Sequence, residues 1–256
     1  MNIAIGTAQF TKNYNLTRKN FSPKSIINYI NNSKEITLID TAPSYGEAEK
    51  IIGMYLKKKI NITSKINPFK YSAVDKNLDK FKKDLEKTLK NFGIDQIYGI
   101  LFHKESDILK SRHDKFFYYL ENLINKEVIC KIGFSTYGTK NIKKNLSVFN
   151  FNIIQLPINI FNSSLNYIEF LKDLKKNKKI EIHARSIFLK GLGFENNIDN
   201  KKFFKLNEKL EILSKISKNN KISKFKLMLI GIYNRKLINT YIIGVNSVKE
   251  MKEINE

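Results

Sequence analysis

Eight short apolar runs, rich in β-branched residues, recur along this chain of 256 residues, and they are the feature that most constrains its fold. The runs occupy residues 2–6, 36–40, 60–65, 97–103, 130–135, 152–157, 180–186 and 241–245. A run that is apolar on both faces is typical of a parallel strand buried between two layers. We therefore expect eight such strands, separated by longer segments.

The longer segments carry the signals of helices. Apolar side chains recur at every third or fourth position in residues 74–92, which predicts an amphipathic helix that Gly93 is suited to end. Ser22 followed by Pro23 predicts the start of another helix. Two further helical pieces are expected at residues 201–217 and 222–233.

The alternation of strands and helices decides the fold class. Eight βα units in about 250 residues fit a (β/α)8 TIM barrel, an α/β fold with a closed parallel eight-stranded sheet, better than an open doubly wound sheet. No Pro- or Gly-rich linker divides the chain. We therefore expect residues 1–256 to form a single, compact barrel domain.

The charge of the chain suggests a nucleic-acid partner at first. Its 46 Lys and Arg residues exceed its 24 Asp and Glu residues, for a formal net charge of +22. Proteins that read nucleic acids rely strongly on Arg, whereas nearly all basic residues here are Lys spread over the helical segments. A solvated, Lys-rich surface is the better interpretation, and no nucleic-acid partner is expected. The charge could still favour anionic ligands.

Other simple features exclude further classes. The first residues do not have the pattern of a signal peptide, and no apolar run approaches the roughly 18 residues of a membrane span. One Cys cannot form an internal disulfide, and it does not join the three His into a recognisable ligand spacing, so neither a disulfide scaffold nor a metal site is expected. We expect a soluble cytoplasmic protein without a membrane partner; no pattern indicates its oligomeric state.

Ionisable residues gather at the ends of consecutive predicted strands. Asp40, Lys65 and His103 end the second, third and fourth strands, and Tyr45 follows Asp40 in the next loop. The carboxyl ends of barrel strands are where catalytic residues lie. Asp40 can pair with Lys65, whose ammonium favours the phenolate form of a nearby tyrosine. Tyr45 is then a credible proton donor to a carbonyl oxygen. Each residue alone can be explained by a structural role. The interpretation therefore depends on all four lying at, or just after, the ends of consecutive predicted strands.

These residues resemble the aldo-keto reductase family. The stretch LIDTAPSYGEAEKIIG, the TSK that ends at Lys65 and the LFH that ends at His103 are similar to its catalytic motifs. The resemblance continues through GTAQF, IGFSTY, IIQLPIN, HARSIFLKGL and YIIGVNS, which lie between residues 6 and 247. It covers essentially the whole chain and is greatest for a short bacterial subgroup.

The resemblance implies an NAD(P)H-dependent oxidoreductase that reduces an aldehyde, a ketone or a keto-sugar to an alcohol. Tyr45 would be the general acid, Lys65 held by Asp40 would assist it, and His103 would orient the carbonyl. Ser135 and Gln155 would hold the nicotinamide carboxamide. The full set of implied cofactor-binding residues is Ser135, Gln155, Arg185, Ser186, Gly244, Asn246, Ser247 and Lys249.

The chain lacks the GxGxxG motif of the other large dinucleotide-binding fold. The loops after the seventh and eighth strands would then hold the phosphates. Ser247 and Glu250 have the spacing of a capping box, which opens a helix and directs backbone N–H groups at an anion. An ordinary helix cap explains the same pattern.

Three features depart from the broader family. Arg185 stands where many members carry an aromatic residue; it could stack on the nicotinamide, bind an acidic substrate group or form a structural salt bridge. NADPH is favoured by family prevalence, but Glu250 would repel a phosphate and could accept from a ribose hydroxyl, so NADH is the alternative. About nine residues follow Ser247, which indicates a truncated C-terminal loop, an open substrate site and a large or polar substrate such as a sugar derivative.

Two other functions are compatible with a barrel of this kind. One is a cofactor-binding but non-catalytic barrel that acts as a sensor or interaction module. The other is an enzyme that forms a Schiff base on Lys65. The complete set of four catalytic residues argues against both.

Overall fold

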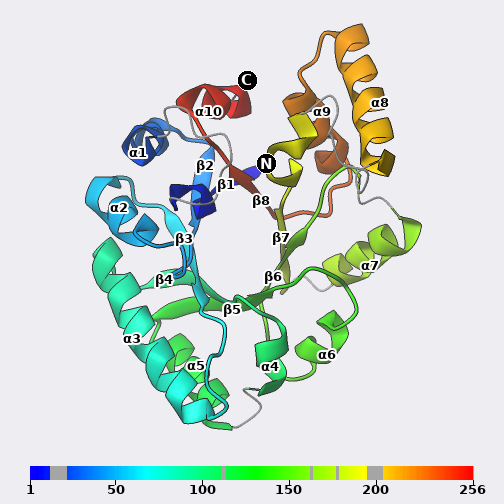
Figure 1. The fold of residues 1–256 in the computed structure, drawn as a ribbon. Helices are drawn as coiled ribbons and strands as arrows, with labels where there is room; N and C mark the ends of the chain where they lie inside the picture. Colours follow the sequence, from blue (N-terminus) through cyan, green and yellow to red (C-terminus); the bar gives the residue numbers. More distant parts are fainter. Residues whose placement is uncertain (12–21, 111–113, 162–163, 177–178, 195–203, 256) are drawn as a thin grey trace.

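The structure is a computed structural model that describes residues 1–11, 22–110, 114–161, 164–176, 179–194 and 204–255. Its eight strands form one closed barrel in sequence order, and every neighbouring pair is parallel (Figure 1). The strands are β1 (Asn2–Gly6), β2 (Ile36–Asp40), β3 (Asn61–Ile66), β4 (Ile97–Phe102), β5 (Ile129–Ser135), β6 (Ile153–Pro157), β7 (Glu181–Arg185) and β8 (Thr240–Gly244). The predicted eight-stranded TIM barrel is confirmed. Each strand begins and ends within one residue of its predicted run.

Helices surround the barrel on its outside (Figure 1). They are α1 (Pro23–Asn32), α2 (Ala48–Tyr55), α3 (Val74–Phe92), α4 (Ser106–Lys110), α5 (Asp114–Asn125), α6 (Ile142–Leu146), α7 (Leu165–Lys176), α8 (Phe204–Asn220), α9 (Lys224–Tyr233) and α10 (Val248–Asn255). Two short 3₁₀ helices, η1 (Ala8–Phe10) and η2 (Leu189–Phe194), follow β1 and β7.

The helix ends follow from local sequence. α3 has the predicted bounds, and Gly93 ends it with a left-handed φ of 63°. The Ser22 side chain accepts a hydrogen bond from the Ser25 N–H, with Pro23 in the first turn, as expected for the start of α1. α8 continues to Asn220, beyond the predicted 217; residues 201–203 of that prediction lie outside the described residues.

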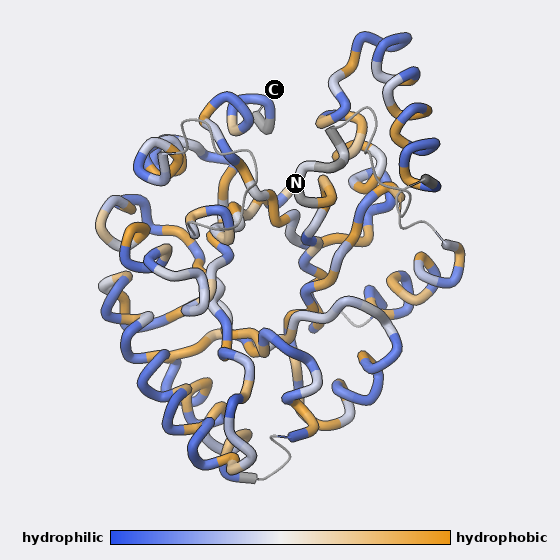
Figure 2. Tube along the Cα trace, viewed as in Figure 1, coloured by the Kyte–Doolittle hydropathy of each residue, from blue (hydrophilic) through white to orange (hydrophobic). Residues whose placement is uncertain are grey.

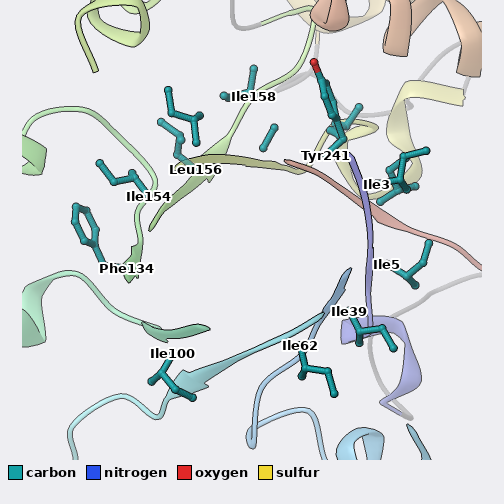
Figure 3. Packing of buried hydrophobic residues seen from close by; sticks show 14 of the residues in the cluster. Ile3, Ile5, Ile39, Ile62, Ile100, Phe134, Ile154, Leu156, Ile158 and Tyr241 are labelled. Carbon is teal, nitrogen blue, oxygen red and sulfur yellow. The ribbon is translucent and has the colours of Figure 1, made fainter. Parts of the chain in front are cut away.

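The main core lies between the strands and the surrounding helices. Figure 3 shows Ile39, Ile62 and Ile100 on the outside of the strand ring, where they are 4% exposed or less. The helices are largely hydrophilic on the side turned to solvent (Figure 2). Apolar burial of this kind is the main stabilising contribution to such a fold. None of the helices in the described ranges is both long and apolar enough to span a bilayer.

Inside the barrel, a small apolar layer lies below the carboxyl ends of the strands. Ala4, Leu38 and Ile242 form this layer. They occupy neighbouring positions of one register across β8, β1 and β2. Two positions further along, the same register carries Gly6, Asp40 and Gly244. The polar groups at the barrel mouth are therefore supported from below by apolar packing.

Candidate active site

A cavity of about 260 Å³ opens at the carboxyl ends of the strands. All four predicted catalytic residues line it: Asp40, Tyr45, Lys65 and His103. Of the predicted cofactor-binding residues, those on the cavity wall are Ser135, Gln155, Arg185, Ser186, Gly244 and Asn246. Ser247 and Lys249 are not among its lining residues.

Asp40, at the end of β2, is the centre of a buried hydrogen-bond network. Its Oδ2 accepts from Lys65 Nζ at 2.8 Å, and Lys65 Nζ also donates to the Thr41 carbonyl at 2.8 Å. Its Oδ1 accepts from Thr63 Oγ1 at 3.0 Å and from Gln155 Nε2 at 2.8 Å. Each carboxylate oxygen therefore has at least one donor, which offsets the cost of burying the charge.

Lys65 remains a cation in this environment. Burial lowers its pKa, but the charges of Asp40 and Tyr45 and the hydrogen bond to Asp40 more than offset this, so the pKa lies above its usual value. The residue is 3% exposed. A fixed ammonium at this position favours negative charge on a neighbouring group.

Tyr45 reaches the cavity through a tight turn after β2. Its N–H donates to the Ala42 carbonyl at 2.9 Å, and Gly46 continues the turn with a φ of 59° that suits glycine. Lys65 Nζ lies 5.3 Å from the centre of the Tyr45 ring. The ring also meets His103 edge to face, with 6.0 Å between ring centres. The turn thus places the phenol beside both residues.

His103 follows β4 directly and is neutral at physiological pH. Burial, followed by the positive charge of Lys65, lowers its pKa from 6.5 to about 4. Ser44 Oγ lies 3.5 Å from its Nδ1. A neutral imidazole carries one N–H and can donate a single hydrogen bond from its ring.

Arg185 ends β7 and lies over the opposite wall of the cavity. Its guanidinium donates to Ser135 Oγ at 3.3 Å, to the Thr136 carbonyl at 2.9 Å and to Ser186 Oγ at 3.4 Å. Its Cζ lies 4.2 Å from the centre of the exposed Tyr137 ring. These partners are neutral oxygens and an aromatic ring, rather than the carboxylate of a structural salt bridge.

Gly244, at the end of β8, lines the cavity and is covered by the Gln9 side chain. A Cβ at Gly244 would come within 1.6 Å of Gln9 Nε2, so the Gln9 amide lies directly on this glycine. Ser247 Oγ accepts from the Glu250 N–H at 3.2 Å, and Glu250 Oε2 accepts from the Asn246 N–H at 2.8 Å. The capping interaction therefore forms, but the carboxylate binds the N–H of Asn246, one residue before Ser247.

Some cavity residues were not identified by the sequence analysis. Tyr137, Phe188 and Phe225 line the cavity. Tyr137 and Phe188 lie in the stretches IGFSTY and HARSIFLKGL, which carry the family resemblance, but neither stretch assigned them a role. Tyr45 and Lys65 were predicted because they lie at or near strand ends. Phe225 lies in helix α9, so the same reasoning does not identify it. No group of three or more His, Cys, Asp or Glu side chains suited to a metal ion occurs in the described part of the chain.

Residues 2–256 match the model of the Aldo/keto reductase family. The chain belongs to this family of oxidoreductases, whose general reaction is NAD(P)H-dependent carbonyl reduction. No curated protein sequence matches the chain.

Solved structures support the same fold. An aldo-keto reductase from Bacillus halodurans, in its holo form, is 16% identical with a TM-score of 0.72, covering 98% of this chain and 84% of that chain. Glycerol dehydrogenase from Gluconobacter oxydans is 17% identical with a TM-score of 0.69, at the same coverages of 98% and 84%. Aldose reductase from Schistosoma japonicum is 18% identical with a TM-score of 0.65, covering 98% and 81%.

Proposed function

We propose that this protein reduces a carbonyl group to an alcohol and that Tyr45 donates the proton. The observation that carries the proposal is the buried Lys65–Asp40 pair, at 2.8 Å, beside the Tyr45 ring and the neutral His103. When bound, the nicotinamide cofactor supplies the hydride. We further propose that residues 1–256 act as one cytoplasmic barrel domain.

Each of the four residues has a distinct role in this proposal. Tyr45 transfers its phenolic proton to the carbonyl oxygen as the alcohol forms, and Lys65 stabilises the phenolate that remains. Asp40 holds the ammonium in place. His103 donates a ring N–H to the carbonyl oxygen and orients it. In the oxidation direction, Tyr45 accepts the proton instead.

The cavity wall suits a nicotinamide cofactor. It combines apolar side chains, among them Ile187 and Ile242, with the hydroxyl of Ser135, as ligand sites generally do. The bare backbone of Gly244 allows close approach once the Gln9 amide moves aside. We propose that Ser135 and Gln155 bind the carboxamide, with the Gln155 amide already oriented by Asp40.

NADPH and NADH are the two candidate cofactors. NADPH remains the proposed cofactor because of family prevalence. The observation that favours NADH is Glu250, whose carboxylate lines the cavity and binds the Asn246 N–H. A carboxylate there disfavours a 2′-phosphate and accepts hydrogen bonds from a ribose hydroxyl. Glu250→Gln should therefore tighten NADPH binding relative to NADH binding, measured as the ratio of the two Kd values in the variant and in the wild type.

Arg185 is proposed to lie against the cofactor. Its guanidinium plane, held by Ser135, Thr136 and Ser186, can stack on a flat ring as an aromatic residue would. Tyr137 already lies beside this group, with its ring centre 4.2 Å from the Arg185 Cζ, which supports a role in contact with flat rings. Arg185→Leu should weaken cofactor binding without altering the fold.

The test of the mechanism is Tyr45→Phe, which removes the acidic proton and little else. We expect turnover with any active carbonyl to fall by at least about 10²-fold, the usual scale for a lost general acid. Cofactor affinity, measured by fluorescence titration with NADPH and NADH, should stay within about twofold. The control is Tyr118→Phe, an exposed tyrosine on α5.

The outcomes of this experiment separate the alternatives. Turnover that survives Tyr45→Phe would exclude Tyr45 as the proton donor. Tight cofactor binding by the wild-type protein, without NAD(P)H oxidation on any aldehyde, ketone or keto-sugar, would favour the non-catalytic sensor. Borohydride trapping of a substrate on Lys65 would favour the Schiff-base reaction.

A further inference from the structure

A second cavity, of about 330 Å³, lies beside the candidate active site. It is lined by the loop after β3, by one face of α3 and by Ser44 in the loop after β2. Ser44 lines the second cavity, directly precedes Tyr45, and has its Oγ 3.5 Å from His103 Nδ1, so the second cavity adjoins two residues of the first. β3 and α3 lie across the barrel from β7 (Figure 1), the side proposed to hold the cofactor.

The loop that covers this second cavity is held in place by side chains. The Phe69 N–H donates to Asp107 Oδ2 at 2.9 Å. Asn77 Oδ1 accepts from the N–H groups of Lys70 and Tyr71, both at 3.2 Å, and Asn77 Nδ2 donates to the Tyr71 carbonyl at 2.7 Å. The cavity is therefore formed before any ligand arrives, which lowers the entropic cost of binding.

Aromatic rings make up much of the cavity wall. Phe69 and Phe81 both pack against Phe116, with ring centres 5.4 Å and 5.6 Å apart, so this part of the wall is rigid. Tyr71 is 49% exposed at the edge. Phe69, Phe81 and Tyr71 thus provide flat apolar surface and one phenolic hydroxyl.

The cavity also contains charged and amide groups. Lys80 and Asp84 form an ion pair on α3, and Asn67 Nδ2 donates to Asp84 Oδ2 at 2.9 Å. The Lys80 side chain is 48% exposed and that of Asp84 is 14% exposed. A carboxylate, an ammonium and an amide beside aromatic rings provide both hydrogen-bond donors and acceptors.

We propose that the second cavity is a distal substrate subsite that binds a polyhydroxylated ring attached to the reacting carbonyl. The C–H faces of such a ring pack on aromatic surfaces, and its hydroxyls hydrogen-bond to Asp84, Lys80 and the Tyr71 hydroxyl. A purely apolar tail fits less well. It would displace the water that hydrogen-bonds to Lys80 and Asp84 and would offer no hydrogen bonds in its place. This assignment rests on the proposed carbonyl reduction.

A subsite at this place would affect catalysis as well as binding. Binding energy from a remote part of the substrate can be used to orient the reacting group, so substrates that lack this part lose kcat as well as affinity. An aldehyde with an attached sugar ring should therefore be turned over more efficiently than a small aldehyde. Glyceraldehyde and maltose form a suitable pair when kcat/KM is calculated on the concentration of free aldehyde, because maltose is almost entirely a cyclic hemiacetal in water. Its second glucose ring stays intact in the open-chain form.

The binding experiment uses ligands that cannot react. Maltitol and lactitol carry a sugar ring but no carbonyl, and saturation-transfer NMR detects their binding whether or not the protein is an active reductase. We expect binding by the wild-type protein, a loss of at least about tenfold in affinity for Tyr71→Ala and Asp84→Asn, and no change for Tyr118→Ala. Absence of wild-type binding to both polyols, or equal binding by Tyr71→Ala, would overturn the proposal.

The activity experiment separates this proposal from the proposed reaction. Tyr71→Ala should lower kcat/KM for maltose about tenfold and leave that for glyceraldehyde within about twofold. Equal losses on both substrates would indicate a general structural effect and contradict the subsite. If the protein binds polyols through Tyr71 but oxidises no NAD(P)H, the proposed sugar subsite is supported and the proposed reductase activity is contradicted.

Discussion

At the scale of single residues, Asp40 organises the candidate site. It binds Lys65 and Thr63 from the next strand and Gln155 from β6, which is 115 positions away in the sequence. Gln155 therefore has a structural contact as well as its proposed contact with the cofactor. Losing the Asp40 carboxylate would leave the Lys65 ammonium buried without its ionic partner, which is strongly destabilising.

The neutrality of His103 predicts a pH profile for catalysis. Because burial and the charge of Lys65 lower its pKa to about 4, the ring stays uncharged well below its ordinary value of 6.5. On the acid side of the profile, we expect kcat/KM for reduction to show no inflection from His103 near pH 6.5 and to respond to this residue only as the pH approaches 4. An inflection near 6.5 that disappears in His103→Gln would contradict this.

The same pKa predicts an effect on stability. The unfolded chain binds the proton near pH 6.5, whereas the folded protein binds it near pH 4. The free energy of unfolding should therefore decrease as the pH falls from 6.5 to 4. Urea unfolding at several pH values should show a shallower decrease for His103→Gln than for the wild type.

At the scale of elements, a polar network connects β4, β5 and β7 inside the barrel. Glu181 accepts from the Tyr98 hydroxyl, at 2.9 Å to each oxygen, and is paired with Lys131 and with the fully buried His183. Burial raises the pKa of Glu181, but hydrogen bonds from His183, Lys131 and Tyr98 more than offset this and bring the pKa down to about 2. The strand pattern does not predict this network.

Breaking this network should destabilise the barrel. Lys131→Met leaves Glu181 without its cation, and we expect a loss of about 2 kcal/mol, below the range for fully buried pairs because both side chains are partly exposed. The control is Lys172→Met, which removes an exposed pair with Glu169 and should cost less than about 1 kcal/mol. Equal unfolding free energies for the two variants would contradict the assignment.

The contact between β5 and β6 requires a glycine. A Cβ at Gly133 would lie 2.3 Å from the Ile153 carbonyl oxygen, so Gly133→Ala forces backbone to move. We expect a loss of about 3 kcal/mol, at the upper end for overpacking. Gly138→Ala is the matched control, because nothing lies within 4 Å of its Cβ; thermal unfolding of both variants tests the difference.

At the scale of the whole molecule, the positive charge comes from lysines that lie both on the outer helices and in the segments between them. The side of the helices turned to solvent is hydrophilic (Figure 2), and the net charge of +22 resides largely on lysines. Such a charge produces a long-range positive potential around the protein. This potential acts on any anionic ligand, whatever the detailed contacts at the barrel mouth.

The potential predicts a dependence on salt. The apparent affinity for NADPH, a polyanion, should fall severalfold as NaCl rises from about 50 to about 300 mM, since the Debye length becomes shorter. KM for glyceraldehyde, which is uncharged, should not change over the same range. A salt response shared by both ligands would point to an effect on the fold instead.

The sequence by itself determined the strand order, the barrel and the placement of Asp40, Tyr45, Lys65 and His103 at the barrel mouth. Apolar periodicity indicates which face of each segment is buried. In a parallel barrel, the carboxyl ends of all the strands lie at the same mouth. Only the tertiary structure decided which groups touch. The bond between Asp40 and Gln155, the network around Glu181, the contact of Glu250 with Asn246 and the second cavity beside Ser44 depend on barrel closure and on interatomic distances. Such distances join residues far apart in the chain, and no local pattern of residues records them.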